Sequence, residues 1–347
     1  MSRMPGASIV VLLVLLASTI CRAEERQPAE QRSPWAPLPL LRGQDKELVW
    51  IAGEKLLHGS TTERRKAAFV LGQIGTDIAL AAPLADGLSD SDRQVRIQAG
   101  VAMAQRGSPY GYEGAKAALY EGDPWLQYYA LFGLNQIGDK RARNLIRQNP
   151  CTGDPFLSQV AAALASAKVS APQGPFFETP LVANDWDELL DVAVQALVDE
   201  ADVWFHEGNY DQVIRCNEAA VFLDPSWVEV YAVTAWLQWS MNRHGAAVST
   251  YRRAASANPD DWEAYFELGF YYMHHGHLRA AVKYLKKSFE LGAPAISARS
   301  YAHALEKSGR LQDALLVWQQ LDNIDESGVV DANIARLRTL LPDAATH

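Results

Sequence analysis

Two internal periods constrain the fold of this chain more than any other feature of its sequence. The first, of 31 residues, relates Asp92, Asp123 and Asp154. The second, of 34 residues, separates Pro225 from Pro259. Periods of about 20–50 residues are typical of repeat architectures, in which each unit buries its apolar face only against its neighbours. The chain is therefore predicted to be built from two arrays of stacked repeats.

Each 31-residue unit has the pattern of a helix pair. An aspartate at the N-cap position can accept hydrogen bonds from free N–H groups of the first turn, and Pro124 and Pro155 follow two of the aspartates where a missing N–H costs nothing. Glycines suited to a left-handed cap close the first helices: Gly75, Gly107 and Gly138. Apolar residues at helical spacing predict the second helices at residues 78–87, 113–120 and 141–147.

Residues 45–168 resemble HEAT-like repeats of the bacterial bilin-lyase type. The similarity is carried by small and apolar residues in two units: Ala68, Leu71, Gly72, Ile74, Gly75, Ala82, Pro83, Leu84 and Leu88, and then Ala130, Leu134, Ile137, Gly138 and Asp139. Lyase chemistry on a tetrapyrrole is known for part of that family. It is not expected here, because the matching residues are packing residues and because residues 1–23 have the pattern of a secretory signal peptide, and an exported chain has no obvious chromophore substrate.

The 34-residue period begins after a second composition change. Residues 169–186 form a Pro-rich linker, since proline and glycine interrupt helices. The following segment, residues 187–327, resembles about four tetratricopeptide repeats, and an amphipathic capping helix and tail are predicted over residues 328–347. The third unit carries the clearest match: Tyr265, Leu268, Gly269, Tyr272, Gly276, Ala281, Leu285 and Ser288. The predicted fold class is all-α, with two α-solenoid arrays of helix-turn-helix repeats forming a superhelix.

The resemblance to tetratricopeptide repeats implies a concave groove lined by the first helix of each unit, where ligand peptides of this family commonly bind. The places that face such a groove give seven candidate residues: Phe205, Trp236, Trp239, Glu263, Phe266, Phe270 and Met273. Aromatic side chains offer large contact area and carboxylates select complementary charge. An apolar or aromatic peptide with basic flanks is therefore the expected ligand.

Two other interpretations of the aromatic residues stay open. In the first, they are covered internally, by a narrow superhelix or by the terminal helix around residues 334–341, because aromatic residues at helical spacing are commonly core residues. In the second, a glycan strand stacks on them, which would make the chain a glycan- or cell-wall-associated binding module. Family members that bind a terminal carboxylate need lysines and asparagines at the groove places, and this sequence has Glu229, Trp236, Glu263 and Phe270 there instead, so a terminal carboxylate is a disfavoured ligand.

The amino end has the pattern of a secretory signal peptide over residues 1–23. A positive start precedes an apolar run of 13 residues, Ser8–Ile20. This run is shorter than the about 20 residues that a membrane-spanning helix needs, so cleavage near Ala23 is favoured over a retained anchor. Lipid attachment at Cys21 is the third alternative, but Ile20 departs from the small residue that this route requires. A Pro-rich tether, residues 24–44, would follow.

The signal peptide predicts export to the periplasm or the medium. A bacterial envelope is favoured, because the sequence lacks the Asn-x-Ser/Thr sequons of a glycosylated eukaryotic secretory protein. Two cysteines outside the signal peptide, Cys151 and Cys216, are too few for a disulfide framework, and a single bridge between them stays open. Thirty-two basic against 41 acidic residues give a net charge of −9, which disfavours nucleic acid as a partner.

No nucleophile beside a base, phosphate-binding loop or metal-ligand spacing stands out, so an enzyme and a cofactor are not expected. His274, His275 and His277 are weak candidates for metal ligands, and a solvated turn is the favoured interpretation. The sequence thus predicts an exported, non-catalytic scaffold or adaptor that binds a protein or peptide partner. It does not predict the partner's identity, the oligomeric state or the relative orientation of the two arrays.

Overall fold

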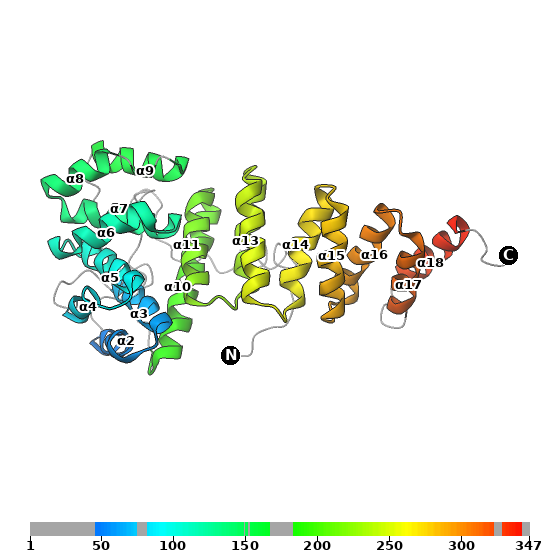
Figure 1. Cartoon of the computed structure of the whole chain (residues 1–347), viewed down its shortest axis with the longest axis horizontal. Coiled ribbons are helices and arrows are strands. Elements are labelled where there is room, and N and C mark those ends of the chain that lie inside the picture. Colours follow the sequence, from blue (N-terminus) through cyan, green and yellow to red (C-terminus); the bar gives the residue numbers. More distant parts are fainter. Residues whose placement is uncertain are drawn as a thin grey trace. The chain divides into compact units, whose positions relative to one another are not determined.

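The computed structural model of the chain describes residues 46–74, 82–148, 150–151, 153–166, 183–322 and 328–341. Within these ranges every regular element is helical, as predicted (Figure 1). The described residues divide into a first unit, residues 46–224, and a second unit, residues 225–341. The predicted signal peptide and tether, Gly75, and most of the predicted linker lie outside the described residues. None of the helices that the structure describes is long and apolar enough to span a membrane.

The first unit consists of helix pairs with the predicted spacing. Its elements are α2 (Lys46–His58), α3 (Thr61–Gln73), α4 (Ala82–Gly87), α5 (Arg93–Gln105), the short 3-10 turn η4 (Pro109–Gly111), α6 (Tyr112–Glu121), α7 (Pro124–Ile137), α8 (Lys140–Arg147), α9 (Pro155–Ser166), α10 (Trp186–His206) and α11 (Tyr210–Leu223). The predicted second helices correspond to α4, α6 and α8. Gly107 and Gly138 have the positive φ expected of left-handed caps, 73° and 63°.

The three periodic aspartates all precede helices, but they do not all cap them. Asp92 accepts hydrogen bonds from the N–H groups of Gln94 and Val95, and Asp154 caps α9 in the same way. Asp123 occupies the N-cap position of α7 without a side-chain hydrogen bond. Asp92 is further held by the Arg65 guanidinium, which donates to both carboxylate oxygens at 2.9 and 2.7 Å. Together these bonds keep the pKa of the Asp92 carboxyl well below its ordinary value.

This difference between equivalent positions gives a matched pair of substitutions. Asp92→Ala is expected to lower the free energy of unfolding by about 1–2 kcal/mol, because it removes an N-cap and an ion pair that joins α5 to α3. Asp123→Ala removes neither a cap bond nor an ion pair and is expected to have a much smaller effect. Urea denaturation followed by circular dichroism measures both; equal losses would show that the N-cap position alone matters.

Helices α10 and α11 share the core of the first unit. The side chain of Phe222, from α11, packs edge-on against Phe69 at a ring-centroid distance of 6.0 Å and in a tilted arrangement against Trp125 at 5.0 Å. Gln212 Nε2 donates to the buried hydroxyl of Tyr128 at 2.8 Å. The helix pair that resembles the first tetratricopeptide unit therefore packs directly on helices of the 31-residue repeats.

The second unit continues the 34-residue pattern. Its helices are α12 (Val228–Ser240), α13 (His244–Ala257), α14 (Trp262–His274), α15 (Leu278–Glu290), α16 (Ala295–Lys307), α17 (Leu311–Leu321) and α18 (Val329–Leu340). Gly276 and Gly309 turn between the two helices of their repeats with φ of 73° and 79°. Asn242 takes the equivalent place with φ of 59°, a conformation that asparagine tolerates better than most residues.

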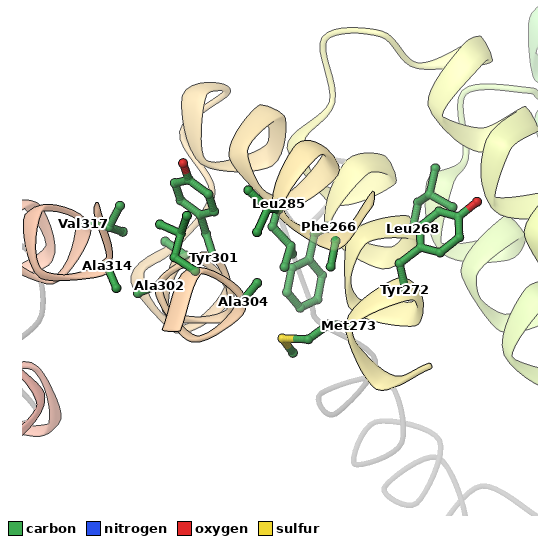
Figure 2. Close-up of a cluster of buried hydrophobic side chains, with 14 of the residues drawn as sticks. Phe266, Leu268, Tyr272, Met273, Leu285, Tyr301, Ala302, Ala304, Ala314 and Val317 are labelled. Carbon is green, nitrogen blue, oxygen red and sulfur yellow. The ribbon is translucent and has the colours of Figure 1, made fainter. Parts of the chain in front are cut away.

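The first helices of these repeats lie next to one another, because α12 contacts α14 and α14 contacts α16. Their inner sides contribute to an apolar core that runs through the repeats (Figure 2). The predicted capping helix corresponds to α18, which packs on α17. Arg336 of α18 also donates to Glu306 of α16, which accepts a second hydrogen bond from the indole N–H of Trp318.

Candidate functional site

Helix α14 carries a row of aromatic rings along one face. Trp262, Phe266, Phe270 and His274 follow at four-residue intervals, which places them one above another on an α-helix. Their successive ring centroids lie 6.2, 5.5 and 4.2 Å apart. The row is buried at Phe266, half-buried at Trp262 and Phe270 and exposed at His274. It therefore combines a fixed apolar base with accessible ring surface.

A second row lies beside the first, one residue further along the chain. It consists of Glu263, Glu267, Tyr271 and His275. The rings of Tyr271 and His275 stack at 4.2 Å, and Trp239 of α12 meets them edge-on at 5.5 and 5.1 Å. Trp239 also lies 6.0 Å from the ring of His274. Through Trp239, the aromatic residues of α12 and α14 form one continuous cluster.

The structure thus brings together four of the seven predicted groove residues: Trp239, Glu263, Phe266 and Phe270. Phe266 and Met273 are buried in the core, where Figure 2 shows them near Leu285. Trp236 is half-buried on α12. Phe205 belongs to the first unit, where its ring lies 5.6 Å from that of Tyr210. The accessible part of the predicted groove in the second unit is therefore formed by Trp236, Trp239 and Phe270.

Helices α12 and α14 together form a wall that carries the aromatic cluster. Its most unusual feature is the pair of glutamates on α14. Glu263 is 5% exposed and Glu267 is 2% exposed. Neither carboxylate oxygen of Glu267 has a hydrogen-bond partner among the described residues. The pKa of each carboxyl is raised to about 8, mainly by burial and in part by neighbouring charge, that of Glu229 acting on Glu263 and that of Glu263 acting on Glu267. A carboxylate is costly to bury without a partner, so these two groups hold protons at neutral pH.

Charge is distributed unevenly between the two helices of each repeat. The first helices, α12 and α14, contain three glutamates, Glu229, Glu263 and Glu267, and no lysine or arginine. The second helices, α13 and α15, carry the basic residues: Arg252, Arg253, Arg279, Lys283, Lys286 and Lys287. The wall formed by α12 and α14 is therefore both aromatic and acidic.

The histidines near this wall are held by their own repeat. His274 and His275 direct Nδ1 toward the backbone carbonyls of Phe270 and Tyr271, at 3.1 and 2.8 Å, and His277 caps the start of α15 by position. Across the residues that the structure describes, no group of three or more histidine, cysteine, aspartate or glutamate side chains could hold a metal ion. Cys151 and Cys216 are free and buried.

Reasoning from the sequence did not single out Glu267, Trp262, Tyr271 or His275 as parts of the wall. The groove places implied by the family resemblance skip these positions. Helical spacing was the available signal, because each belongs to a four-residue series that contains a predicted residue, either 262–266–270–274 or 263–267–271–275.

Comparison with known proteins agrees with the helical repeats. Tetratricopeptide repeat models match residues 228–261 and 250–283. Two crystal structures of MamA are similar at 18% identity: one covers 42% of this chain and 81% of its own, with a TM-score of 0.36, and the other 44% and 92%, with a TM-score of 0.33. The crystal structure of yeast Tom70 is similar at 11% identity and a TM-score of 0.37, over 84% of this chain and 62% of that protein.

A search of curated protein sequences found no match. The similarity to the tetratricopeptide repeat therefore rests on the two matching models, and the helix pairs, turns and 34-residue spacing described above agree with it. Both models fall on α12–α15, the helices that build the aromatic and acidic wall. Residues 228–283 of this chain match models of the tetratricopeptide repeat.

Proposed function

We propose that this protein is an exported, non-catalytic scaffold that binds a partner protein through the wall formed by α12 and α14. The observation that carries the proposal is an aromatic cluster that combines the buried ring of Phe266 with the half-buried rings of Trp239 and Phe270 and the exposed ring of His274. Rigid aromatic side chains of this kind dominate the energy of protein interfaces, because they bury large areas at low entropic cost.

The export part of the proposal is supported by the signal-peptide pattern of residues 1–23. The HEAT-like resemblance of residues 45–168 supports a second docking face on the same chain. Helix pairs stacked in an array expose extended surfaces, and such surfaces are what repeat proteins use for binding. The bacterial envelope is therefore the compartment in which partners are to be sought.

Phe270→Ala is expected to weaken capture of the partner by about 10-fold or more, because it removes the half-buried ring at the centre of the cluster. The measurement is affinity capture from an extract of the cell envelope, followed by titration of the purified captured protein against the chain. Circular dichroism checks that the variant keeps its helical content.

Leu316→Ala provides the matched control. Leu316 is an exposed apolar residue of α17 in the same unit, 58% accessible, and lies away from α12 and α14 in the chain. Its replacement is expected to leave the affinity unchanged. Equal binding by the Phe270→Ala variant and the native chain would refute the assignment of the wall as the binding surface.

A further inference from the structure

An acidic row leads from the surface into the wall of α12 and α14. Glu229 lies in the first turn of α12, and Glu263 lies in the first turn of α14 behind its N-cap, Asp261. Glu229 and Asp261 are half-buried, and both are close enough to Glu263 to raise its pKa. Glu267 continues the row one helical turn further in. The carboxyl groups of Glu229, Asp261 and Glu263 therefore approach one another. The carboxyl group of Glu267 forms the inner end of the row.

No basic side chain within the described part of the second unit pairs with the inner end of this row. Both oxygens of Glu267 are buried without a hydrogen-bond partner. The arginines of the neighbouring helix α13 are engaged elsewhere: Arg252 donates to the Tyr272 hydroxyl at 2.8 Å, and Arg253 lies over the ring of Tyr231 at 5.8 Å. Tyr251 of α13 faces Glu267 with a neutral hydroxyl that supplies no positive charge.

A purely structural role does not explain these groups. A glutamine or an apolar residue of similar size would fill the same space without the energy needed to bury a carboxyl group. Helix N-termini favour negative charge, which accounts for Glu229 and Glu263 in first turns, but Glu267 lies beyond the first turn of α14. An unpartnered buried acid beside an accessible acidic cluster is what a site for a cationic group requires before its ligand binds.

We infer that the partner of this wall presents an arginine or lysine side chain that binds against Glu263 and Glu267, flanked by apolar residues that pack on Phe270 and Trp239. This inference rests on the proposed function and names the chemistry of the partner segment. The cation supplies the missing hydrogen-bond donors, and the aromatic row beside it holds the neighbouring side chains. Charge complementarity then selects among apolar partners, because an uncharged segment would leave the acids unpaired.

The test is a selection of random dodecapeptides displayed on phage against the purified chain. The native chain is expected to enrich peptides in which arginine or lysine stands next to aromatic or large aliphatic residues. The double variant Glu263→Gln/Glu267→Gln keeps the size of both side chains and removes the carboxyl groups, which can ionise against a bound cation. It is expected to bind the selected peptides, made synthetically, about 10-fold or more weakly, the usual scale of a lost charged hydrogen bond.

Glu290→Gln is the control, because Glu290 is an exposed acid of α15 that pairs with Lys286 of its own helix, at 3.4 Å. Its affinity for the peptides should be unchanged. Peptides that depend on Phe270 but contain no basic residue, or that bind the double variant equally well, would overturn the inference while leaving the proposed function standing. Enrichment of no peptide, or of peptides insensitive to Phe270→Ala, would overturn both.

Discussion

Replacing Gly100 by alanine is expected to destabilise the first unit by about 3 kcal/mol, the upper end of the cost of overpacking a core. Gly100 of α5 and Gly114 of α6 face each other where the two helices cross. A Cβ added to Gly100 would lie 2.5 Å from the Cα of Gly114, and one added to Gly114 would lie 2.5 Å from the Cα of Gly100. The obstructing atoms are backbone, so no change of side-chain rotamer can relieve the clash.

Thermal and urea unfolding of the full chain measure this effect. Gly153→Ala is the control in the same unit, because a Cβ at Gly153 meets nothing within 4 Å. It should leave the transition of the first unit within about 0.5 kcal/mol of the native value, as surface substitutions usually do. A Gly100→Ala variant as stable as the control would mean that α5 and α6 can separate at little cost, contrary to the close crossing described here.

Several features of the fold could be predicted because short-range chemistry determines them. Helix starts follow from an aspartate with a proline behind it, as at Asp154, and turns follow from residues that accept a positive φ. The latter holds even at Asn242, which the sequence places where a glycine usually stands and which does take a positive φ of 59°. The 34-residue spacing then determines which helices are neighbours.

Other features depend on pairs of residues far apart in the chain, which one sequence does not reveal. The Gly100–Gly114 contact and the packing of Phe222 on Phe69 are of this kind. The same limit applies to Asp123, whose position predicts a cap that its side chain does not make. Glu267 was missed for a related reason: its chemical interest comes from burial, and in the sequence it is an ordinary charged residue of a helix.

Glu267→Gln is expected to stabilise the chain at alkaline pH, in contrast to most substitutions of buried residues. Burial raises the pKa of Glu267 in the folded state to about 8, whereas its ordinary value is 4.5. The folded state therefore binds the proton more tightly than the unfolded state does. Between pH 4.5 and 8 the unfolded chain has released this proton and the folded chain has kept it, so the free energy of unfolding falls as the pH rises.

The substitution should therefore leave the free energy of unfolding unchanged below pH 4.5, where both states are protonated. Its stabilising effect should grow with pH until the carboxyl of the folded native chain ionises near pH 8. Glutamine has nearly the same shape as a protonated glutamate and never ionises. The expected gain at pH 8.5 is about 2–4 kcal/mol, from the linkage between a pKa shift and stability. Glu263 has a similarly raised pKa, one helical turn away, so the two substitutions should not be additive.

Urea unfolding of the native chain and the Glu267→Gln variant at pH 5 and pH 8.5 measures this difference, with Glu290→Gln as an exposed control that should show no such pH dependence. A variant no more stable than the native chain at pH 8.5 would show that the carboxyl of Glu267 already has a partner. If the Glu267→Gln variant is more stable but binds the peptides more weakly, stability and binding trade off against each other, as is common at functional sites. Groups that are placed to contact a ligand lack hydrogen-bond partners until the ligand binds. The native chain would then keep Glu267 for binding, at the expense of its own stability.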